Sequence, residues 1–535
     1  MNPKILVIGL DAATMSLVRP WADAGHLPAL ASLMREGAYG DLISTPNMHS
    51  ASAWTSILTG LNPGRHGLFV FSDRDFATGH QLFFKGGDRA GRIISAHLSR
   101  HNLTAGLLNV PMTYPAQCAT GGYSISGLDA PTLDERAFCP VGLREEVFKR
   151  FPNYSFSPPG LGDLMRSGRL NDAVAAWLKL VETQTAVAEY LIEERPVDFF
   201  MTVYTASDWG GHNLWKLIDG EENPLLSIYR ALDRAIARLV ERASSDTQVY
   251  VISDHGMGPH TGASYHLARW LEERGRMVRR GGTDRKAALI DAGKRVARNI
   301  LPVSVRERVK TGMGAERLKR IQTNEKDSFY SSIDWERTTA YTEPGRHVIN
   351  INLAGRNRAG VVGQEEYDGV CGEIIEELKA WRDSRGVPFV ERVARKGEVY
   401  SGPYAERASD LYVYWNPEAD AGDPPDEVRA RGFWWSGDHR PEGILICRGR
   451  GVIKGSEFDK ASVYDLLPTI LYLAGLPVPG DLDGQVIRSV CTEEFLAQNP
   501  VRLEESGEGA PPESVRLSDS EEGMIEEKLR GLGYL

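Results

Sequence analysis

The sequence predicts an α/β fold, with a doubly wound, mostly parallel sheet flanked by helices. Two observations predict it. Short apolar runs rich in β-branched residues, typical of central parallel strands, recur along the chain. Amphipathic helical patterns, such as residues 171–194 and 226–243, lie between these runs. Because strands that alternate with helices build such sheets, and ligands bind beyond the carboxyl ends of the strands, we expect a functional site where the runs end.

Three of the apolar runs end at carboxylates or histidines. They are residues 4–10, followed by Asp11; residues 198–204, which lead to Asp208; and residues 248–253, followed by Asp254 and His255. The carboxyl ends of parallel strands meet at one edge of a sheet. We therefore expect these polar side chains to lie on the face where a site is built.

Composition narrows the functional classes. The 535 residues are 42% apolar and 25% charged, which is ordinary for a folded soluble protein and excludes collagen-like and disordered chains. The net charge of −10 argues against a dedicated nucleic-acid binder, which usually carries a basic balance. Oligomeric state cannot be inferred from these properties.

The cysteines and the N-terminus bear on the compartment. The five cysteines are widely spaced and form no CxxC pair, which favours reduced thiols over a disulfide framework or a cysteine zinc site. The apolar run at residues 5–10 is shorter than a signal-peptide core, and no stretch reaches the length of a membrane span. We expect a cytoplasmic protein.

The pattern of charge divides the chain. Residues 268–320 hold sixteen Lys and Arg against six Asp and Glu, on apparent amphipathic helices. We expect residues 1–265 and 336–490 to form one discontinuous catalytic core, and residues 266–335 to form a basic helical insertion. The insertion is either a cap beside the site or a solvated excursion, and its charge would also suit contact with an anionic membrane surface. Residues 491–535 are expected to be a linker followed by a C-terminal helix.

Two groups of residues have the chemistry of metal ligands. Asp208 and His212 are four residues apart, so on a helix they share one face. Asp254 and His255 are adjacent at the end of a buried strand, with a glycine on their C-terminal side that permits a sharp turn. Carboxylate and imidazole ligands in this mixture suit Zn²⁺, and also Mn²⁺ or Fe.

A third feature is the segment Ser50–Gly60, which has the pattern of a loop that enters a helix. A hydroxyl at a helix N-terminus faces backbone N–H groups and the positive end of the helix dipole. That environment stabilises an alkoxide and binds phosphate. Taken alone, Ser50 or Ser52 is more simply a helix N-cap.

Together, these motifs resemble the alkaline phosphatase superfamily, in its type I phosphodiesterase/nucleotide pyrophosphatase branch. The motifs, in family order, are Gly9-Leu-Asp11, residues 50–67, residues 204–212, Ser253-Asp-His-Gly-Met257, residues 437–443 and residues 465–484. The resemblance spans about residues 4–490 apart from the basic insertion. It implies the fold predicted above.

The resemblance also implies two divalent metal ions, with zinc favoured and Mn²⁺ or Fe as alternatives. One ion would be held by Asp11, Ser50, Asp254 and His255, and the other by Asp208, His212 and His439. Ser50 would be the nucleophile and would form a phospho-serine intermediate. Counting back from Thr59-Gly60 selects Ser50 over Ser52 and Thr55.

The sequence departs from the family pattern after this helix. Nucleotide pyrophosphatases place an asparagine there to hold a phosphoryl oxygen, and the equivalent position here is Phe71. Another group, such as a backbone N–H or a basic residue of the insertion, must then hold that oxygen. We therefore take Phe71, together with His49 beside the nucleophile, as candidate substrate-binding positions.

The function that these observations predict is metal-dependent hydrolysis of small phosphoric esters, most simply a phosphodiesterase reaction. Three alternatives stay open at this point: a phosphomonoesterase, a phosphomutase of the same superfamily, and a non-catalytic sensor of anionic ligands. A sulfatase is disfavoured, because residues 50–54 lack the Pro and Arg of that branch.

Overall fold

A computed structural model of the chain describes residues 2–220, 222–280, 329–425, 435–505 and 515–532. Its main feature is a nine-stranded sheet with the strand order β17-β2-β16-β9-β1-β8-β5-β6-β7. The strands are β1 (Ile5–Leu10), β2 (Ala38–Ile43), β5 (Ala105–Val110), β6 (Tyr123–Ser126), β7 (Phe138–Cys139), β8 (Phe199–Tyr204), β9 (Gln248–Ile252), β16 (Glu442–Arg448) and β17 (Ser456–Ser462).

The centre of this sheet is parallel. Strand β1 pairs in parallel with β8 and β9, and β5 continues the parallel set through β8 and β6. Antiparallel pairing occurs toward the edges, where β16 lies between β9 and β2 and where β7 pairs with β6. The predicted fold class, a mostly parallel sheet flanked by helices, is confirmed.

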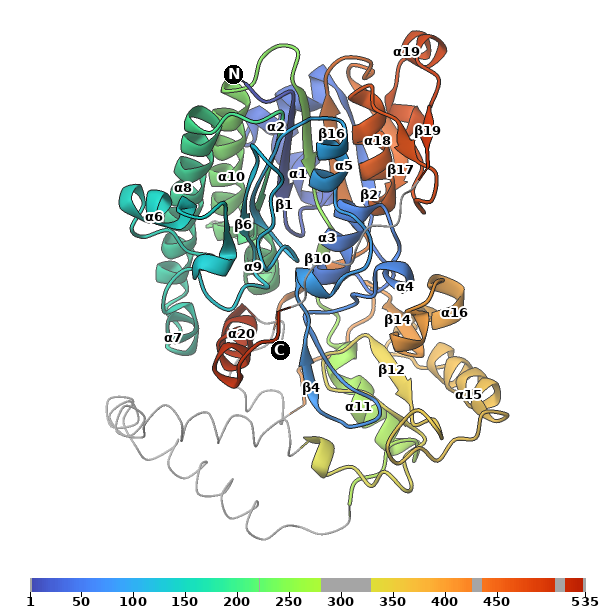
Figure 1. Cartoon of the computed structure of the whole chain (residues 1–535). Coiled ribbons are helices and arrows are strands. Elements are labelled where there is room, and N and C mark those ends of the chain that lie inside the picture. The colour runs from blue at the N-terminus through green and yellow to red at the C-terminus, as the bar shows by residue number, and fades with distance from the viewer. Residues whose placement is uncertain (1, 221, 281–328, 426–434, 506–514, 533–535) are drawn as a thin grey trace.

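Helices cover both faces of the sheet, as Figure 1 shows. Because successive strand side chains point to opposite faces, Leu6 and Ile8 of β1 enter one core while Ile5 and Val7 enter the other. The first core is covered mainly by α1 (Met15–Asp23), α2 (Pro28–Glu36), α6 (Leu143–Arg150), α7 (Leu161–Arg166), α8 (Leu170–Glu194), α9 (Ala206–Leu214) and α10 (Pro224–Glu241). The second is covered by α3 (Ser50–Thr59), α5 (Ile94–Arg100) and α18 (Leu466–Leu473).

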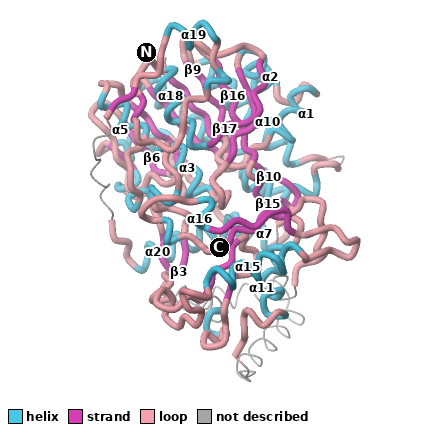
Figure 2. The backbone as a smooth tube through the Cα atoms, turned by 90° about the vertical axis from the view of Figure 1, so that its right-hand side faces the viewer, coloured by secondary structure: helices cyan, strands magenta, loops and turns pink. Residues whose placement is uncertain are grey.

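A smaller unit, which we call the second lobe, comprises residues 263–280 and 329–421. Its antiparallel sheet has the order β11-β12-β14-β13 and a hydrophobic core of its own. Its elements are α11 (Ala263–Glu273), β11 (Ala340–Tyr341), β12 (Val348–Ile351), α15 (Tyr367–Lys379), β13 (Val390–Arg395), α16 (Lys396–Val399) and β14 (Leu411–Trp415). In Figure 2 the ribbon of β10 (Gly256–Pro259) and β15 (Gly437–Arg440) lies between the large sheet and helices α11 and α15.

The second lobe changes the division expected from the sequence. After residue 336 the chain first builds this separate sheet, and it rejoins the large sheet only at β16. Residues 338–353 have strand-like sequence, but a single strand pattern does not reveal which sheet the strand joins. Of the expected insertion at 266–335, residues 266–273 belong to α11 in the core of the second lobe. Residues 281–328 lie outside the described part of the chain.

Among the described residues, no helix has the length and apolarity needed to cross a membrane. The C-terminal helix α20 (Asp519–Leu532) places Ile525, Leu529 and Leu532 in the first core, where each is at most 6% exposed. Helix α19 (Glu493–Gln498) and strand β19 (Leu503–Glu504) precede it in residues 491–505. The region expected to be a linker is thus partly structured.

One expectation about the cysteines is wrong. Cys118 and Cys139 form a disulfide, with 5.9 Å between their Cα atoms, whereas Cys371, Cys447 and Cys491 are buried free thiols. The two cysteines are 21 residues apart, a spacing that matches no short cysteine motif, so the sequence did not indicate the disulfide. The pairing arises because Cys139 lies in β7, at the edge of the sheet beside β6. The cytoplasmic location was inferred partly from reduced thiols and stays a prediction.

We predict that the protein unfolded in denaturant without reductant exposes three reactive thiols of its five cysteines. Reduction before unfolding should raise the count to five, and a Cys118→Ser variant should read four without reductant. Thiol titration with a chromogenic disulfide measures each number. Five thiols in the unreduced wild-type protein would contradict the disulfide.

Candidate active site

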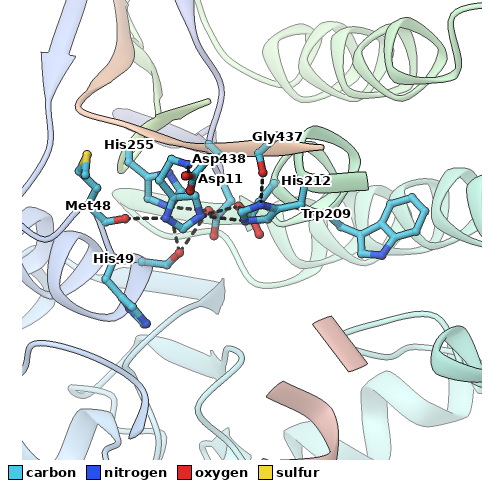
Figure 3. A network of polar contacts seen from close by, with 12 residues as sticks. Asp11, Met48, His49, Trp209, His212, His255, Gly437 and Asp438 are labelled. Carbon is cyan, nitrogen blue, oxygen red and sulfur yellow. Dashed lines mark hydrogen bonds and ion pairs between the residues drawn. The ribbon is translucent and has the colours of Figure 1, made fainter. Parts of the chain in front are cut away.

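The site lies where the central strands end, and Figure 3 shows its network of polar contacts. Asp11 directly follows β1, Asp208 lies in the first turn of α9 after β8, and Asp254 and His255 follow β9. His439 comes from the far segment β15, where it is opposite Met257 in the β10–β15 ribbon. The structure therefore brings together the six carboxylates and histidines that the sequence singled out.

The first group consists of Asp11, Asp254 and His255, whose ligand atoms all lie within 4.8 Å of one another. His255 Nε2 is 3.6 Å from Asp11 Oδ1 and 3.3 Å from Asp254 Oδ2. All three side chains are fully buried. Asp254 Oδ2 accepts no hydrogen bond from the described residues. A buried carboxylate oxygen without a donor is costly, and a bound cation would satisfy it.

The second group consists of Asp208, His212 and His439. Asp208 Oδ1 lies 3.3 Å from Nε2 of each histidine, and the two Nε2 atoms are 2.9 Å apart. The ring centroids of His255 and His439 are 3.9 Å apart, so the two groups are in direct contact. The expected i, i+4 relation of Asp208 and His212 on one helix is realised in α9.

The histidines are oriented by backbone carbonyls. Nδ1 lies 3.1 Å from Gly256 O in His255, 3.0 Å from Gly437 O in His212 and 2.7 Å from Met48 O in His439. A carbonyl only accepts, so each Nδ1 carries the proton and each Nε2 directs its lone pair into the site. The Nε2 atoms of His212 and His439 are 2.9 Å apart, and their lone pairs repel each other unless both bind a cation. These residues fit divalent metal ions.

Carboxylate crowding dominates the electrostatics of the site. Burial, and then the charges of Asp254 and Asp208, raise the pKa of Asp11 well above its ordinary value. Burial and the charge of Asp208 likewise raise the pKa of Asp254 to about 8. Burial also opposes ionisation of Asp208, but His212 and His439 hold its pKa well below the ordinary value. The positively charged groups of the protein do not neutralise three ionised carboxylates at this site.

Ser50 is the first residue of α3 and is fully buried. Its Oγ lies 3.1 Å from His255 Nε2 and 3.4 Å from Asp11 Oδ1, which places it beside the first group. The other two hydroxyls of this turn point elsewhere. Ser52 Oγ donates to His49 O or Asn47 Oδ1, and Thr55 Oγ1 donates to Ala51 O. The count along the sequence thus selected the hydroxyl that faces the metal-ligand candidates.

The two substrate-binding candidates have different environments. His49 caps α3, because its Nδ1 accepts from the N–H of Ala51 at 3.2 Å. Burial, and then the positive charge of Arg346, lower the pKa of His49 well below its ordinary value. Phe71 is 1% exposed in the first core and its ring is 5.2 Å from that of His49. Phe71 therefore supports His49 and offers no open surface to a substrate.

The sequence indicated a second layer of polar contacts only through Asp438, the neighbour of His439, and it missed the partners of that residue. Asp438 lies 3.3 Å from His347 Nε2 and 3.7 Å from His260 Nε2, and it accepts the backbone N–H of His439. Burial alone would raise the pKa of Asp438, but His347 and His260 hold it well below its usual range. In the sequence, the only sign that Asp438 has a role is that it directly precedes His439. The sequence does not indicate that His260 and His347 contact Asp438, because this arrangement depends on the second lobe.

The second lobe also holds the loop that precedes Ser50. The Tyr400 hydroxyl is 3.1 Å from Asn47 Oδ1, and the Tyr414 hydroxyl donates to Pro46 O at 2.9 Å. Asn47 Oδ1 also accepts from Ser52 Oγ at 2.8 Å. These contacts tie the nucleophile turn to a unit that the sequence did not separate from the core.

Comparison with known proteins identifies the family to which the chain belongs. The model of the type I phosphodiesterase/nucleotide pyrophosphatase family matches residues 5–437. The chain belongs to this family. The resemblance drawn from the motifs is confirmed, and with it the assignment to enzymes that hydrolyse phosphoric esters. No curated protein matches the sequence.

One of the similar solved structures supports the fold. Murine ectonucleotide pyrophosphatase/phosphodiesterase 5, as an inactive variant in complex with AMP, aligns with a TM-score of 0.50 at 11% identity, over 92% of this chain and 100% of that one. The human protein of the same name aligns with a TM-score of 0.48 at 13% identity, over 92% of this chain and 100% of that one. At such identities the murine structure supports the fold alone.

The crowded carboxylates lead to a prediction for the metal-free protein. The pKa of Asp254 is about 8 when folded, against 3.8 as its ordinary value, so the folded state binds a proton that the unfolded state has lost. Stability from this group is present at low pH and is lost as the pH rises toward 8. Because the loss is complete once the pH passes about 8, thermal unfolding of chelated protein should show a Tm that falls from pH 6 to pH 8.

Two comparisons check the cause. Asp254→Asn, which cannot ionise, should flatten the fall in Tm, and saturation with Zn²⁺ or Mn²⁺ should also flatten it by offsetting the negative charge. If Tm in the chelated wild-type protein did not change between pH 6 and pH 8, the crowding described here would be wrong.

Proposed function

We propose that the protein is a metal-dependent phosphodiesterase that works through a phospho-serine on Ser50. The observation that supports this most directly is the position of Ser50 Oγ, at the N-terminus of α3 and 3.1 Å from His255 Nε2. A serine hydroxyl is a weak nucleophile, and metal coordination is one recognised way to activate it. The substrate is a small phosphoric ester.

The residues divide between two ions. Asp11, Asp254, His255 and the Ser50 oxygen would hold one ion, and Asp208, His212 and His439 would hold the other. When bound, two divalent ions supply Lewis-acid stabilisation of the attacking and leaving oxygens in an in-line displacement at phosphorus. The donor set of carboxylates and imidazoles favours zinc, with Mn²⁺ or Fe as alternatives.

The chain itself performs the transfer in two steps. Ser50 Oγ gives its proton to solvent and attacks phosphorus, the bond from phosphorus to the leaving ester oxygen breaks, and the released alkoxide takes a proton from water. A water molecule then attacks the phospho-serine, the bond from Oγ to phosphorus breaks, and Oγ takes up one proton of that water, which regenerates Ser50 and releases a phosphate monoester. The backbone N–H groups at the start of α3 and its dipole stabilise negative charge at Oγ throughout.

The nucleophile is tested by two neighbouring serines. We expect Ser50→Ala to lower turnover by at least about 10³-fold, because it removes the covalent route, while the bound metal stays near the wild-type content. The matched control is Ser52→Ala, which breaks contacts with Asn47 and His49 O and should cost about 1 kcal/mol of stability with most activity retained. Ser50→Ala with full activity would rule out the phospho-serine.

The metal assignment is tested by His439. We expect His439→Ala to lose one of two bound ions, because Nε2 of this residue is directed at Asp208 and His212. Metal content per chain after gel filtration, measured by mass spectrometry, gives the stoichiometry. The control His80→Ala changes an exposed histidine and should keep both ions. Equal stoichiometry in the two variants would argue against the division of ligands.

The reaction class is tested by paired rates on a phosphate diester and a phosphate monoester with the same nitrophenol leaving group. The protein would be loaded in turn with Zn²⁺ and Mn²⁺. We expect faster hydrolysis of the diester. Preference for the monoester would favour a phosphomonoesterase or a phosphomutase, and inactivity on both with metal bound would favour a sensor of anionic ligands.

A further inference from the structure

Three consecutive residues before His439 contact His212, the imidazole that α9 contributes to the second group. The N–H of Ser436 donates to the carbonyl of His212 at 2.8 Å, and Gly437 O accepts from Nδ1 of His212 at 3.0 Å (Figure 3). The indole of Trp435 stacks on the imidazole, with 3.8 Å between the ring centroids and 24° between the ring planes. We call residues 435–437 the histidine clamp.

The indole restrains a motion that the hydrogen bonds leave free. A bond at Nδ1 fixes the position of that atom, but it still allows the imidazole to rock about the bond between Cβ and the ring. A second ring against one face of the imidazole opposes this rocking, because the edge of the imidazole would collide with the indole. The direction of the His212 Nε2 lone pair, which must meet Asp208 and His439 at one point, therefore depends on Trp435.

The second lobe holds the histidine clamp in place. The backbone N–H of Trp435 donates to the hydroxyl of Tyr265, in α11, at 3.1 Å. The ring of Tyr265 stacks on that of His260, with 4.5 Å between the centroids, and the N–H of His260 donates to Ser436 O at 3.0 Å. Because α11 belongs to the core of the second lobe, the clamp is anchored outside the large sheet that carries the carboxylates.

The clamp packs directly against α9. A Cβ atom on Gly437 would collide with Gly211 O, so glycine permits the close approach of these two backbones. His212 is 1% exposed and Trp435 is half-buried, so the stack keeps water from one face of the imidazole. The negative face of an indole attracts a ring that a bound cation has made electron-poor. The stack therefore stabilises the ion-bound state more than the ion-free state.

We propose that Trp435 is a positioning residue for the second group: by stacking on His212 it directs Nε2 of that residue at the ion and raises the affinity for the ion. The inference deepens the proposed function and rests on it for the division of the ligands between two ions. It adds to the ligand set, because an indole has no lone pair to offer a metal ion and acts only through the imidazole.

The test measures metal affinity, so that it does not depend on turnover. Titration of the full-length, zinc-loaded protein with a chromogenic chelator gives a dissociation constant for each ion. We expect Trp435→Leu to bind one ion about ten-fold or more weakly than the wild type, because leucine fills space without a ring. Trp435→Phe should recover most of the affinity, because it keeps a ring on the imidazole. The control Trp335→Leu changes a half-buried tryptophan of the second lobe that packs on Tyr330 and Tyr341, and it should bind both ions as the wild type does.

A double variant locates the effect. We expect His439→Ala to retain the ion of the first group, whereas Trp435 stacks on a residue of the second. Adding Trp435→Leu to His439→Ala should therefore leave the affinity for the remaining ion unchanged. A further loss of about ten-fold for that ion would show that the substitution loosens the whole centre, and it would overturn the proposal.

The outcomes separate this inference from the proposed function. Wild-type affinity for both ions in folded Trp435→Leu would overturn the inference even if the protein hydrolyses diesters. An ion whose affinity depends on Trp435, in a protein that turns over no ester, would support the inference while the proposed function fails. If Trp435→Leu does not fold, Tyr265→Phe decides. Loss of the hydroxyl that accepts the Trp435 N–H should weaken binding of the same ion about three-fold, and unchanged affinity there overturns the proposal.

Discussion

Like-charge repulsion among Asp11, Asp208 and Asp254 is the constraint on which the site depends. These carboxylates follow three adjacent parallel strands, β1, β8 and β9, so the topology of the sheet forces them together. Burial prevents water from screening them, and the pKa of Asp11 and of Asp254 is raised in response. A fold that concentrates negative charge in this way gains most from cations, and the inward lone pairs of three histidines serve the same end.

The second lobe completes this centre. It supplies His347 to Asp438, Tyr400 to Asn47 and Tyr414 to the carbonyl of Pro46. None of these contacts reaches the candidate metal ligands directly, yet together they fix the turn before Ser50 and the strand that carries His439. Groups that orient reacting residues in this manner let a site hold its geometry before substrate arrives.

The sequence predicted those parts of the protein in which chemistry follows local pattern. Buried strands that end in carboxylates, as at Asp11 and Asp254, revealed the sheet, and helical spacing paired Asp208 with His212. Contacts that depend on distant segments could not be predicted in this way. Cys118 and Cys139 meet only at a sheet edge, His347 meets Asp438 only because a second sheet forms, and Phe71 proves to be a core residue once the packing around it is known.

The hydrogen bond from His439 Nδ1 to Met48 O has a consequence for how the centre assembles. His439 belongs to one ligand group, whereas the backbone of Met48, held at a φ of +47°, leads within two residues to Ser50 of the other. Fixing the imidazole in one group therefore also fixes the turn that serves the other. Any free-energy coupling that this contact carries between the two halves is reciprocal: whatever effect occupancy of one half has on the other, occupancy of the other has in return.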